Sequence, residues 1–260
     1  MKTSEIISII KEAKSRFFDG QKHSFNELDS KGLNQLVTNI DIATEKYLVD
    51  EFSKLIPNSS FIAEESHGNT SDAEFQWIID PLDGTTNFIH QIPAYSISVA
   101  LQQNGQTIAG FVYELNRNEM FVATERGAFL NDESISVTKT DNMEDTLIAT
   151  GFPYYDFKDM DSYLSVLEYC MRNTRGVRRL GSAAVDLAYI AMGRFDGFFE
   201  VGLSPWDVAA GAYIVQQAGG KVTDFNGGDS FIFGGEIVAG NPVITDKLQR
   251  LIQTHFEKNA

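Results

Sequence analysis

The chain of 260 residues contains one cysteine, Cys170. A single cysteine cannot form an intrachain disulfide, and it cannot supply the several thiolates of a zinc or iron–sulfur site. Proteins without disulfides are typical of reducing compartments. We therefore expect a cytoplasmic protein whose stability comes from a buried core, for which the chain is long enough.

Basic residues are also few, since 21 Lys and Arg stand against 36 Asp and Glu, for a net charge of −15. This balance disfavours direct binding to nucleic acid or to an anionic membrane, because both need a basic face. No segment approaches the roughly 18 consecutive apolar residues of a membrane span. The surplus of acids leaves two interpretations open: a solvated acidic surface, or carboxylates gathered around divalent cations.

What the chain does contain is typical of a globular protein, with 43% apolar and 22% charged residues. Helical periodicity predicts amphipathic helices at 1–18 and 41–55, with an irregular segment at 20–39 between them. Residues 95–137 alternate in the manner of an antiparallel meander, and from about residue 161 helices alternate with short strands. We expect an N-terminal α+β half, residues 1–145, and a C-terminal α/β half, residues 146–260, packed as one globule.

Acidic residues gather where a hydrophobic strand is predicted to end. This strand, ending at Ile79, would deliver Asp80, and Asp83 follows three residues later. Gly84 lets the backbone approach a ligand, and the Thr-Thr-Asn run at 85–87 is typical of a helix start, whose N–H groups bind anions. Because carboxylates attract cations, a phosphate bridged to a divalent metal would satisfy both features. The alternative is a plain turn in which Asp83 caps the helix.

Two further acids stand at the ends of predicted elements. Glu64 follows a predicted strand at 60–63, and Asp207 opens a predicted helix at 206–217. The alternatives are a solvated loop for Glu64 and a helix cap for Asp207. These acids form a metal site with Asp80 and Asp83 only if the fold brings them together, and periodicity does not show that it does.

Two strings carry a resemblance: Asp80-Pro-Leu-Asp-Gly-Thr-Thr-Asn-Phe88 and Trp206-Asp-Val-Ala-Ala-Gly211, with Glu-Glu-Ser at 64–66. They resemble the inositol monophosphatase family of Mg²⁺-dependent, Li⁺-sensitive phosphatases. The runs at 181–188, 197–200 and 218–220 are similar to those of its bacterial members, and the motifs span nearly the whole chain. The resemblance implies a mixed αβ fold, a layered αβαβα sandwich. Ala63, where the family usually has Gly, and Gln35, where an acid is common, depart from its pattern.

The resemblance also implies a site of two or three Mg²⁺ ions, with Li⁺ as an inhibitor. The implied metal ligands are Glu64, Asp80, the carbonyl of Leu82, Asp83 and Asp207, with Asp80 bridging two ions. The implied catalytic residues are Asp41, Thr85 and Glu64, where Thr85 and Asp41 orient the attacking water. The implied substrate-binding residues are Asp83, Gly84, Thr85, Gly181, Ser182, Ala183, Glu200 and Asp207. Without the resemblance, Asp41 would equally be a helix cap, and Glu200 a surface acid at a strand end.

The function implied is hydrolysis of inositol 1-phosphate, or a similar small polyol phosphate, by a metal-activated water without a covalent intermediate. Related substrates remain open: fructose 1,6-bisphosphate, 3′-phosphoadenosine 5′-phosphate or histidinol phosphate. A regulatory, transcription-associated protein on the same fold is a further alternative, because some bacterial relatives bind transcription machinery. The presence of all four metal acids favours catalysis, and the family implies a homodimer.

Overall fold

A computed structural model of the chain describes residues 2–19, 28–32, 35–66, 73–153 and 156–256. Seven α-helices are found within these residues. They are α1 (Thr3–Phe17), α2 (Asn39–Leu55), α3 (Thr85–Ile89), α4 (Met160–Asn173), α5 (Ala183–Ala191), α6 (Pro205–Gln217) and α7 (Pro242–Phe256). Two short 3₁₀ helices, η2 (Met143–Asp145) and η3 (Ser230–Ile232), lie in connections.

The first large sheet has seven strands in the order β3-β4-β5-β6-β7-β8-β9. Their bounds are β3 (Ser60–Ala63), β4 (Phe75–Asp83), β5 (Ser96–Gln103), β6 (Gln106–Glu114), β7 (Glu119–Thr124), β8 (Gly127–Leu130) and β9 (Glu133–Ser134). β3 and β4 are parallel, and every later pair is antiparallel. The antiparallel meander predicted at 95–137 is therefore confirmed.

The second large sheet has five strands in the order β11-β10-β12-β14-β13. Their bounds are β10 (Leu147–Thr150), β11 (Gly176–Arg178), β12 (Gly197–Val201), β13 (Lys221–Thr223) and β14 (Glu236–Gly240). β10 pairs in parallel with β11 and β12, whereas β14 is antiparallel to β12 and β13. The helix and strand alternation expected in this half is present.

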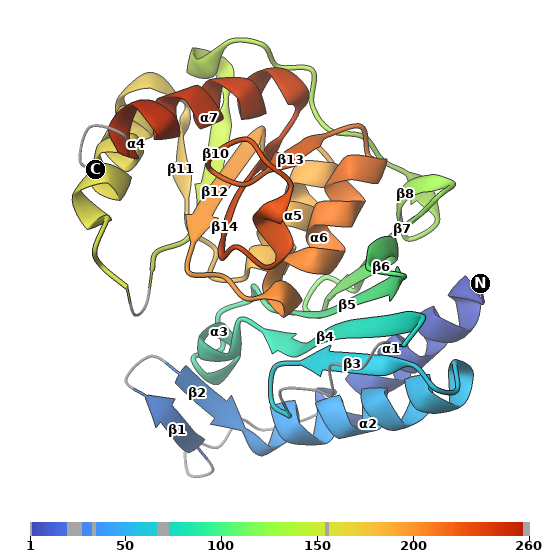
Figure 1. Cartoon of the computed structure of the whole chain (residues 1–260). Coiled ribbons are helices and arrows are strands. Elements are labelled where there is room, and N and C mark those ends of the chain that lie inside the picture. The colour runs from blue at the N-terminus through green and yellow to red at the C-terminus, as the bar shows by residue number, and fades with distance from the viewer. Residues whose placement is uncertain (1, 20–27, 33–34, 67–72, 154–155, 257–260) are drawn as a thin grey trace.

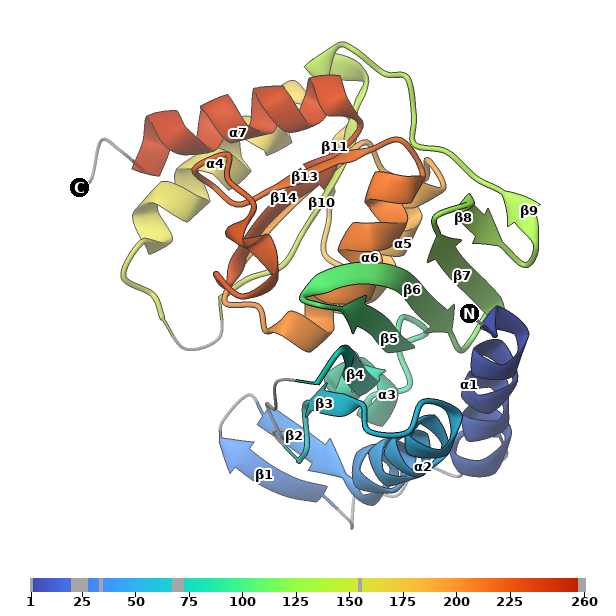
Figure 2. The same ribbon diagram turned by 45° about the vertical axis from the view of Figure 1, so that its right-hand side comes forward.

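The helices and sheets stack as five layers, αβαβα (Figures 1 and 2). α1 and α2 cover the outer face of the seven-stranded sheet, α5 and α6 lie between the sheets, and α4 and α7 cover the five-stranded sheet. Three apolar cores fill these layers. The first, under α1 and α2, contains Trp77, Tyr113 and Phe52; the second, around α5 and α6, reaches both sheets and contains Phe198; the third, under α4 and α7, contains Phe199. The layered sandwich expected from the motifs is the observed fold.

The side-chain alternation of the strands directs polar groups toward the middle layer. On β4, Trp77 and Ile79 join the core under α1 and α2, while Ile78 joins the core around α5 and α6. On β12, Phe198 faces the middle layer and Phe199 faces α4 and α7. Because neighbouring residues of a strand face opposite sides, the acids that continue these strands face the middle layer.

The segment between the first two helices differs from the irregular loop expected at 20–39. β1 (Leu28–Gly32) and β2 (Gln35–Thr38) pair antiparallel, and α2 begins directly afterwards at Asn39. Polar composition alone suggested a loop, yet the backbone of polar residues can form the hydrogen bonds of an antiparallel pair. Residues 20–27 and 33–34 of that segment lie outside the described residues.

We propose that the chain divides after residue 145 into the two expected halves, which fold as one unit. The division falls between β9 and β10, and α5 and α6 of the second half pack against the sheet of the first. If the halves were separated, each would expose the apolar residues that it contributes to the core around α5 and α6. Within the described residues, none of the helices is long and apolar enough to cross a membrane.

Candidate active site

An irregularity in β4 places two acids on one face of the sheet. Asp80 pairs with Ser98 of β5 and Asp83 pairs with Ser96, so β4 has one residue more than β5 between these pairs. In a regular strand, residues three apart face opposite sides, and one extra residue restores the match. β4 also continues through Pro81 to Asp83, beyond the end predicted at Ile79.

The same face meets the start of α6. The hydroxyl of Ser98, opposite Asp80, donates to the carbonyl of Trp206, the residue before Asp207 (3.2 Å). Carboxylate oxygens of Asp80, Asp83 and Asp207 lie within 4.8 Å of one another, a spacing that suits a metal ion. Asp80 and Asp83 are buried and Asp207 is half-buried. The fold therefore brings together three of the four acids that stand at element ends in the sequence.

Glu64 lies next to Asp80 because β3 runs parallel to β4. Ala63 pairs with Ile79, so the residues that follow, Glu64 and Asp80, are neighbours, and the charge of Glu64 raises the pKa of Asp80. The turn after β3 is held by the buried carboxylate of Glu45 on α2, which accepts from the amides of residues 65 (2.7 Å) and 66 (2.8 Å). Glu64 is half-buried, which excludes the fully solvated loop considered from the sequence.

Asp83 is fixed from the opposite side by the start of α5. One of its oxygens accepts from the hydroxyl of Ser182 (2.5 Å) and from the amide of Ala184 (2.7 Å). Ser182 also caps α5 by accepting from Val185. Asp83 does not cap α3, whose N-terminal cap is Gly84, so the alternative considered for it from the sequence is wrong.

Asp207 has a structural task besides its place among the acids. Ser204 is the N-terminal cap of α6, and its amide donates to the Asp207 carboxylate (2.6 Å). Asp207 therefore sits in the first turn of the helix and is not the cap itself. One carboxylate oxygen stabilises the helix start, and the other remains available to the acid cluster.

Thr85 and Asp41 meet although they lie far apart in the chain. The Thr85 hydroxyl lies 3.1 Å from Oδ1 of Asp41 and 3.0 Å from the carbonyl oxygen of Leu82, two acceptors for its single proton. Asp41 is fully buried in the first turn of α2, which begins two residues earlier. Gly84 has φ +94°, and a Cβ there would lie 2.9 Å from the carbonyl oxygen of Ala94, so only glycine fits this turn.

Burial and mutual repulsion raise the pKa values of the clustered carboxyl groups. Burial, with the charge of Asp207, raises the pKa of Glu64 to about 8, and burial with the charge of Asp83 raises that of Asp207 to about 7. Burial raises the pKa of Asp83 to about 6 against the opposing hydrogen bonds of Ser182 and α5. The pKa of Asp80 is raised well above its usual value by burial and by its acidic neighbours.

These shifts predict a pH dependence of the stability of the metal-free protein. Each folded-state pKa lies above the value of about 4 for an exposed carboxyl group, so the folded state binds more protons than the unfolded state. The contribution is complete below that value and is lost as the pH rises through the folded pKa values. We expect the thermal unfolding midpoint to fall between about pH 6 and about pH 8, the interval spanned by the three values.

Calorimetric melting in chelator at several pH values measures this effect, with added Mg²⁺ as the comparison. Mg²⁺ should reduce the fall, because a cation neutralises the repulsion among the carboxylates. Glu64→Gln is the control, since its side chain at 64 does not titrate. A midpoint that stays level or rises over this interval would show that these carboxyl groups are not destabilised when ionised.

The remaining substrate-binding candidates border the acid cluster. Gly181, Ser182 and Ala183 form the entry to α5, which contacts Asp83. Glu200 on β12 is 6% exposed, and its pKa is raised well above its usual value by burial and by the charges of Asp207 and Asp83. The surface position considered for Glu200 from the sequence is therefore wrong.

Sequence reasoning assigned no role to Asp186. Asp186 on α5 is 1% exposed, and its Oδ1 has no hydrogen-bond partner among the described residues. Its pKa is raised well above its usual value by burial and by Glu200 and Asp83. The Arg179 guanidinium opposes these shifts at Asp83, Asp186 and Glu200. A lone acid inside the apolar run of α5 was the signal that could have identified Asp186.

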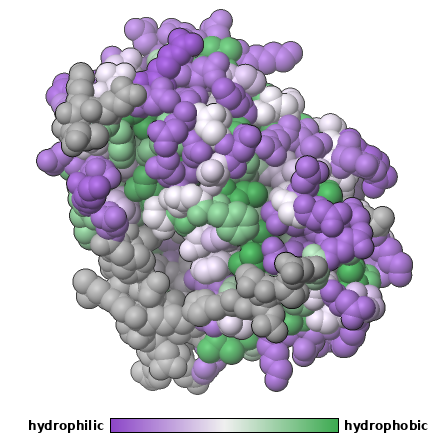
Figure 3. All heavy atoms as spheres, viewed as in Figure 1, coloured by the Kyte–Doolittle hydropathy of each residue, from purple (hydrophilic) through white to green (hydrophobic). Residues whose placement is uncertain are grey.

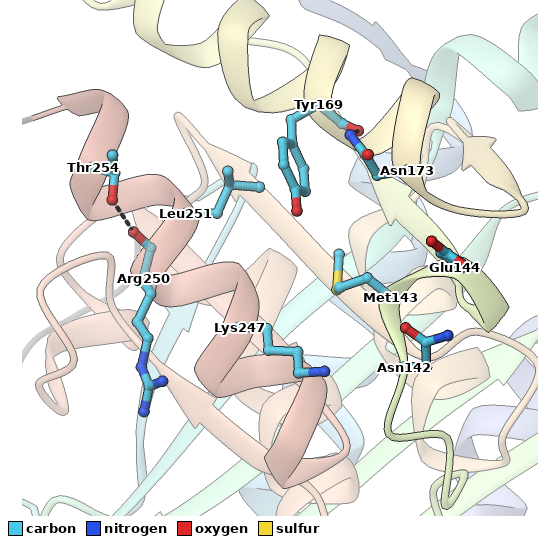
Figure 4. Close-up of a pocket in the computed structure, with 9 residues that line it drawn as sticks. All are labelled: Asn142, Met143, Glu144, Tyr169, Asn173, Lys247, Arg250, Leu251 and Thr254. Carbon is cyan, nitrogen blue, oxygen red and sulfur yellow. Dashed lines mark hydrogen bonds between the residues drawn. The ribbon is translucent and has the colours of Figure 1, made fainter.

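A concavity lies on the outer layer, between α4, α7 and the segment around η2 (Figure 4). It has a volume of about 500 Å³, and its lining includes Met143, Tyr169, Lys247 and Leu251. None of the candidate site residues lines it. On the face of the molecule shown in Figure 3, hydrophilic residues predominate toward the edges of the view, and hydrophobic residues lie nearer its centre.

Comparison with known proteins agrees with the observed fold. The profile of the inositol monophosphatase family matches residues 2–259. The chain is 44% identical over 218 residues to Nus factor SuhB of Escherichia coli (strain K12), covering 83% of this chain and 82% of that protein. The crystal structure of extragenic suppressor protein suhB from Bartonella henselae matches with a TM-score of 0.89 at 38% identity, over 96% of this chain and 98% of that one. Inositol monophosphatase from Anabaena (Nostoc) matches with a TM-score of 0.77 at 38% identity, over 83% and 86%.

Proposed function

Because this chain belongs to the inositol monophosphatase family, we propose that it is an Mg²⁺-dependent phosphomonoesterase acting on inositol 1-phosphate or a similar small polyol phosphate. The observation that supports this proposal is the cluster of Asp80, Asp83 and Asp207, whose carboxylate oxygens lie within 4.8 Å of one another. All the donors are hard oxygens without a histidine or cysteine among them, which suits Mg²⁺ and disfavours zinc. Their crowding in the metal-free state also indicates a site that a divalent cation would stabilise.

We propose that the site takes two or three Mg²⁺ ions. Glu64, Asp80 and the carbonyl of Leu82 would hold one ion, and Asp80, Asp83 and Asp207 would hold a second. When bound, Mg²⁺ neutralises charge on the phosphate and the leaving oxygen and lowers the pKa of water. Without a cation, the carboxylates would repel a phosphate dianion, so activity should vanish in chelator.

The chain's own residues would orient the attacking water. An ionised Asp41 would only accept, so it would direct the Thr85 hydroxyl proton toward itself and leave the Thr85 oxygen free to accept a hydrogen bond from water. We also propose a catalytic role for Glu64, because its carboxylate, beside Asp80, would help to hold the ion that lowers the pKa of water. In-line attack by water needs no covalent intermediate.

Substrate binding divides into a phosphate part and a hydroxyl part. We propose that the amides of Gly84 and Thr85 hold the phosphate, because N–H groups at a helix start have no partner within the helix. Glu200, with the backbone at Gly181 to Ala183, would bind the hydroxyl groups of the polyol. Glu200 lies near Asp83 and Asp207, so it can contact a substrate whose phosphate is held by the acid cluster.

A phosphate-release screen tests the proposed function. The purified protein is assayed with Mg²⁺ on inositol 1-phosphate, fructose 1,6-bisphosphate, 3′-phosphoadenosine 5′-phosphate and histidinol phosphate, with chelator as the control. We expect Mg²⁺-dependent release, fastest from inositol 1-phosphate. Release from none of the four by a protein that binds Mg²⁺ in calorimetry would overturn the proposal.

Lithium sensitivity is a further expected result. Li⁺ is a small monovalent cation that can take an Mg²⁺ position among the carboxylates but neutralises less charge. We expect LiCl to inhibit phosphate release at concentrations where NaCl has no effect. The matched NaCl titration separates site occupancy from ionic strength, and equal curves would place this protein among the lithium-insensitive members of its family.

A second candidate function follows from the name Nus factor SuhB of the Escherichia coli relative. We propose that the chain also serves as a regulatory, transcription-associated protein, through protein contacts, because a net charge of −15 disfavours direct binding to RNA. Immobilised protein should retain components of the transcription machinery from cell extract at low salt. The catalytically impaired Asp83→Asn should retain them equally, and retention of none by either protein would contradict this role.

We also propose that the protein forms a homodimer and is located in the cytoplasm. The dimer is expected from the family, and the location from the single, buried Cys170. Sedimentation equilibrium over a range of concentrations tests the first. A single species with the mass of one chain throughout that range would exclude a stable dimer.

A further inference from the structure

Gly151 and Glu200 lie side by side because of the pairing of β10 with β12. Thr150 is paired with Phe199 in parallel register, and each is followed by one of these two residues. A Cβ added to Gly151 would lie 1.8 Å from Oε1, 1.9 Å from Cδ and 2.2 Å from Oε2 of Glu200. The Glu200 carboxylate therefore occupies the space that any other side chain at position 151 would fill.

The requirement for glycine here concerns space and not backbone conformation. Gly151 is not among the glycines with positive φ, so alanine could adopt its backbone geometry. The contact atoms are the end of a side chain, and they can move when a Cβ is introduced. Any adjustment would therefore fall first on the Glu200 carboxylate.

The backbone beside Gly151 is held firmly from the third core. The buried Tyr163 donates its hydroxyl to the carbonyl of Gly151 (2.8 Å). The Thr150 hydroxyl lies 2.6 Å from the Tyr163 hydroxyl and 2.8 Å from the carbonyl oxygen of Phe199 on β12. These bonds tie the end of β10 to both α4 and β12, so the backbone is less free to retreat than the Glu200 side chain.

We propose that Gly151 is a specificity-determining position, which sets where the Glu200 carboxylate meets the hydroxyl groups of the substrate. The inference rests on the proposed function and adds a residue that acts through Glu200 without touching the reacting phosphate. The substrate class selected in this way is a phosphate monoester whose alcohol carries further hydroxyl groups. An ester without them gains nothing from the placement of Glu200.

Gly151→Ala tests the inference by a comparison of two substrates. For inositol 1-phosphate, KM should rise roughly tenfold, as expected when one hydrogen bond to a charged group is lost. For phenyl phosphate, which has no ring hydroxyl, kcat/KM should fall far less. Calorimetric binding of Mg²⁺ should match the wild-type protein, since Gly151 is not proposed to contact a metal ligand. An unchanged KM for inositol 1-phosphate would overturn the inference.

The double variant Gly151→Ala with Glu200→Ala supplies the decisive measurement. Glu200→Ala removes the carboxylate from the space beside Gly151, so the new Cβ then has room. Gly151→Ala should therefore change KM for inositol 1-phosphate little when it is added to Glu200→Ala. An equal rise in both backgrounds would show that residue 151 acts on the backbone and not through Glu200.

Gly228→Ala is the matched control. Gly228 lies on an exposed turn, and a Cβ there would lie 2.8 Å from Oδ2 of another carboxylate, that of Asp224. KM for inositol 1-phosphate should be unaffected in this variant, and a rise equal to that of Gly151→Ala would contradict the inference. Thermal unfolding of each variant reports whether it is folded. If wild-type protein neither binds nor hydrolyses inositol 1-phosphate, the proposed function fails, whereas normal wild-type turnover with an unaffected Gly151→Ala variant refutes this inference alone.

Discussion

Thr85→Ala and Asp41→Asn are each expected to lower kcat by roughly 10²–10⁴-fold, the range typical of a positioned acid–base group. The Thr85 hydroxyl has one proton and two acceptors, Asp41 and the carbonyl of Leu82. An ionised carboxylate is the stronger acceptor. An amide at position 41 would release this proton to Leu82, and the water would lose its orientation.

KM and Mg²⁺ affinity should change far less than kcat, because neither Thr85 nor Asp41 is proposed as a ligand of the two main ions. The losses should also be non-additive, since either substitution alone breaks the same hydrogen bond. Kinetics of the two single variants and the double variant measure this directly. Losses that multiply fully would mean that the two residues act separately.

Two controls sharpen the test of the Thr85 hydroxyl. Thr85→Ser keeps a hydroxyl at the same place and should retain much of the activity. Thr86→Ala removes a neighbouring, exposed hydroxyl and should have a small effect. A loss in Thr86→Ala comparable to that in Thr85→Ala would indicate that both substitutions disturb the short helix α3.

Asp83→Asn is expected to lower Mg²⁺ affinity and activity together. Loss of an outer-shell partner alone typically costs about 10–100-fold in metal affinity, so loss of a ligating charge should cost at least that. The amide fits the site, because its oxygen can accept from Ser182 and Ala184 as the carboxylate does. Its NH₂ group then replaces the oxygen that remained for the cation.

The metal-free Asp83→Asn protein should be as stable as wild type or more so near pH 8. At that pH the wild-type carboxyl, with a pKa of about 6, is ionised among other acids, and the amide removes this charge. Calorimetry of Mg²⁺ binding and of thermal unfolding measures both effects. Asp132→Asn, on the exposed turn before β9, is the matched control. Unchanged Mg²⁺ affinity in Asp83→Asn would exclude Asp83 from the site.

Patterns in the sequence predicted most of the individual helices and strands. Apolar spacing located β3 at residues 60–63, and the helix predicted at 206–217 begins one residue earlier in the structure. The alternation at 95–137 located the antiparallel meander formed by β5 to β9. Such predictions succeed because periodicity and turn chemistry involve residues close in the chain. The hairpin of β1 and β2 was not predicted, because its strands carry no apolar alternation.

The family motifs determined which residues to examine, but their meeting was decided only by the tertiary structure. The Thr85 hydrogen bond spans 44 residues and that of Ala184 to Asp83 spans 101. Local spacing carries no information about contacts over such separations. The extra residue in β4, which turns Asp80 and Asp83 to one face, and the space that Gly151 leaves for Glu200 are set by the pairing of strands. The sequence alone therefore determined the elements and the chemical types of the site, and packing of the two sheets around α5 and α6 decided their geometry.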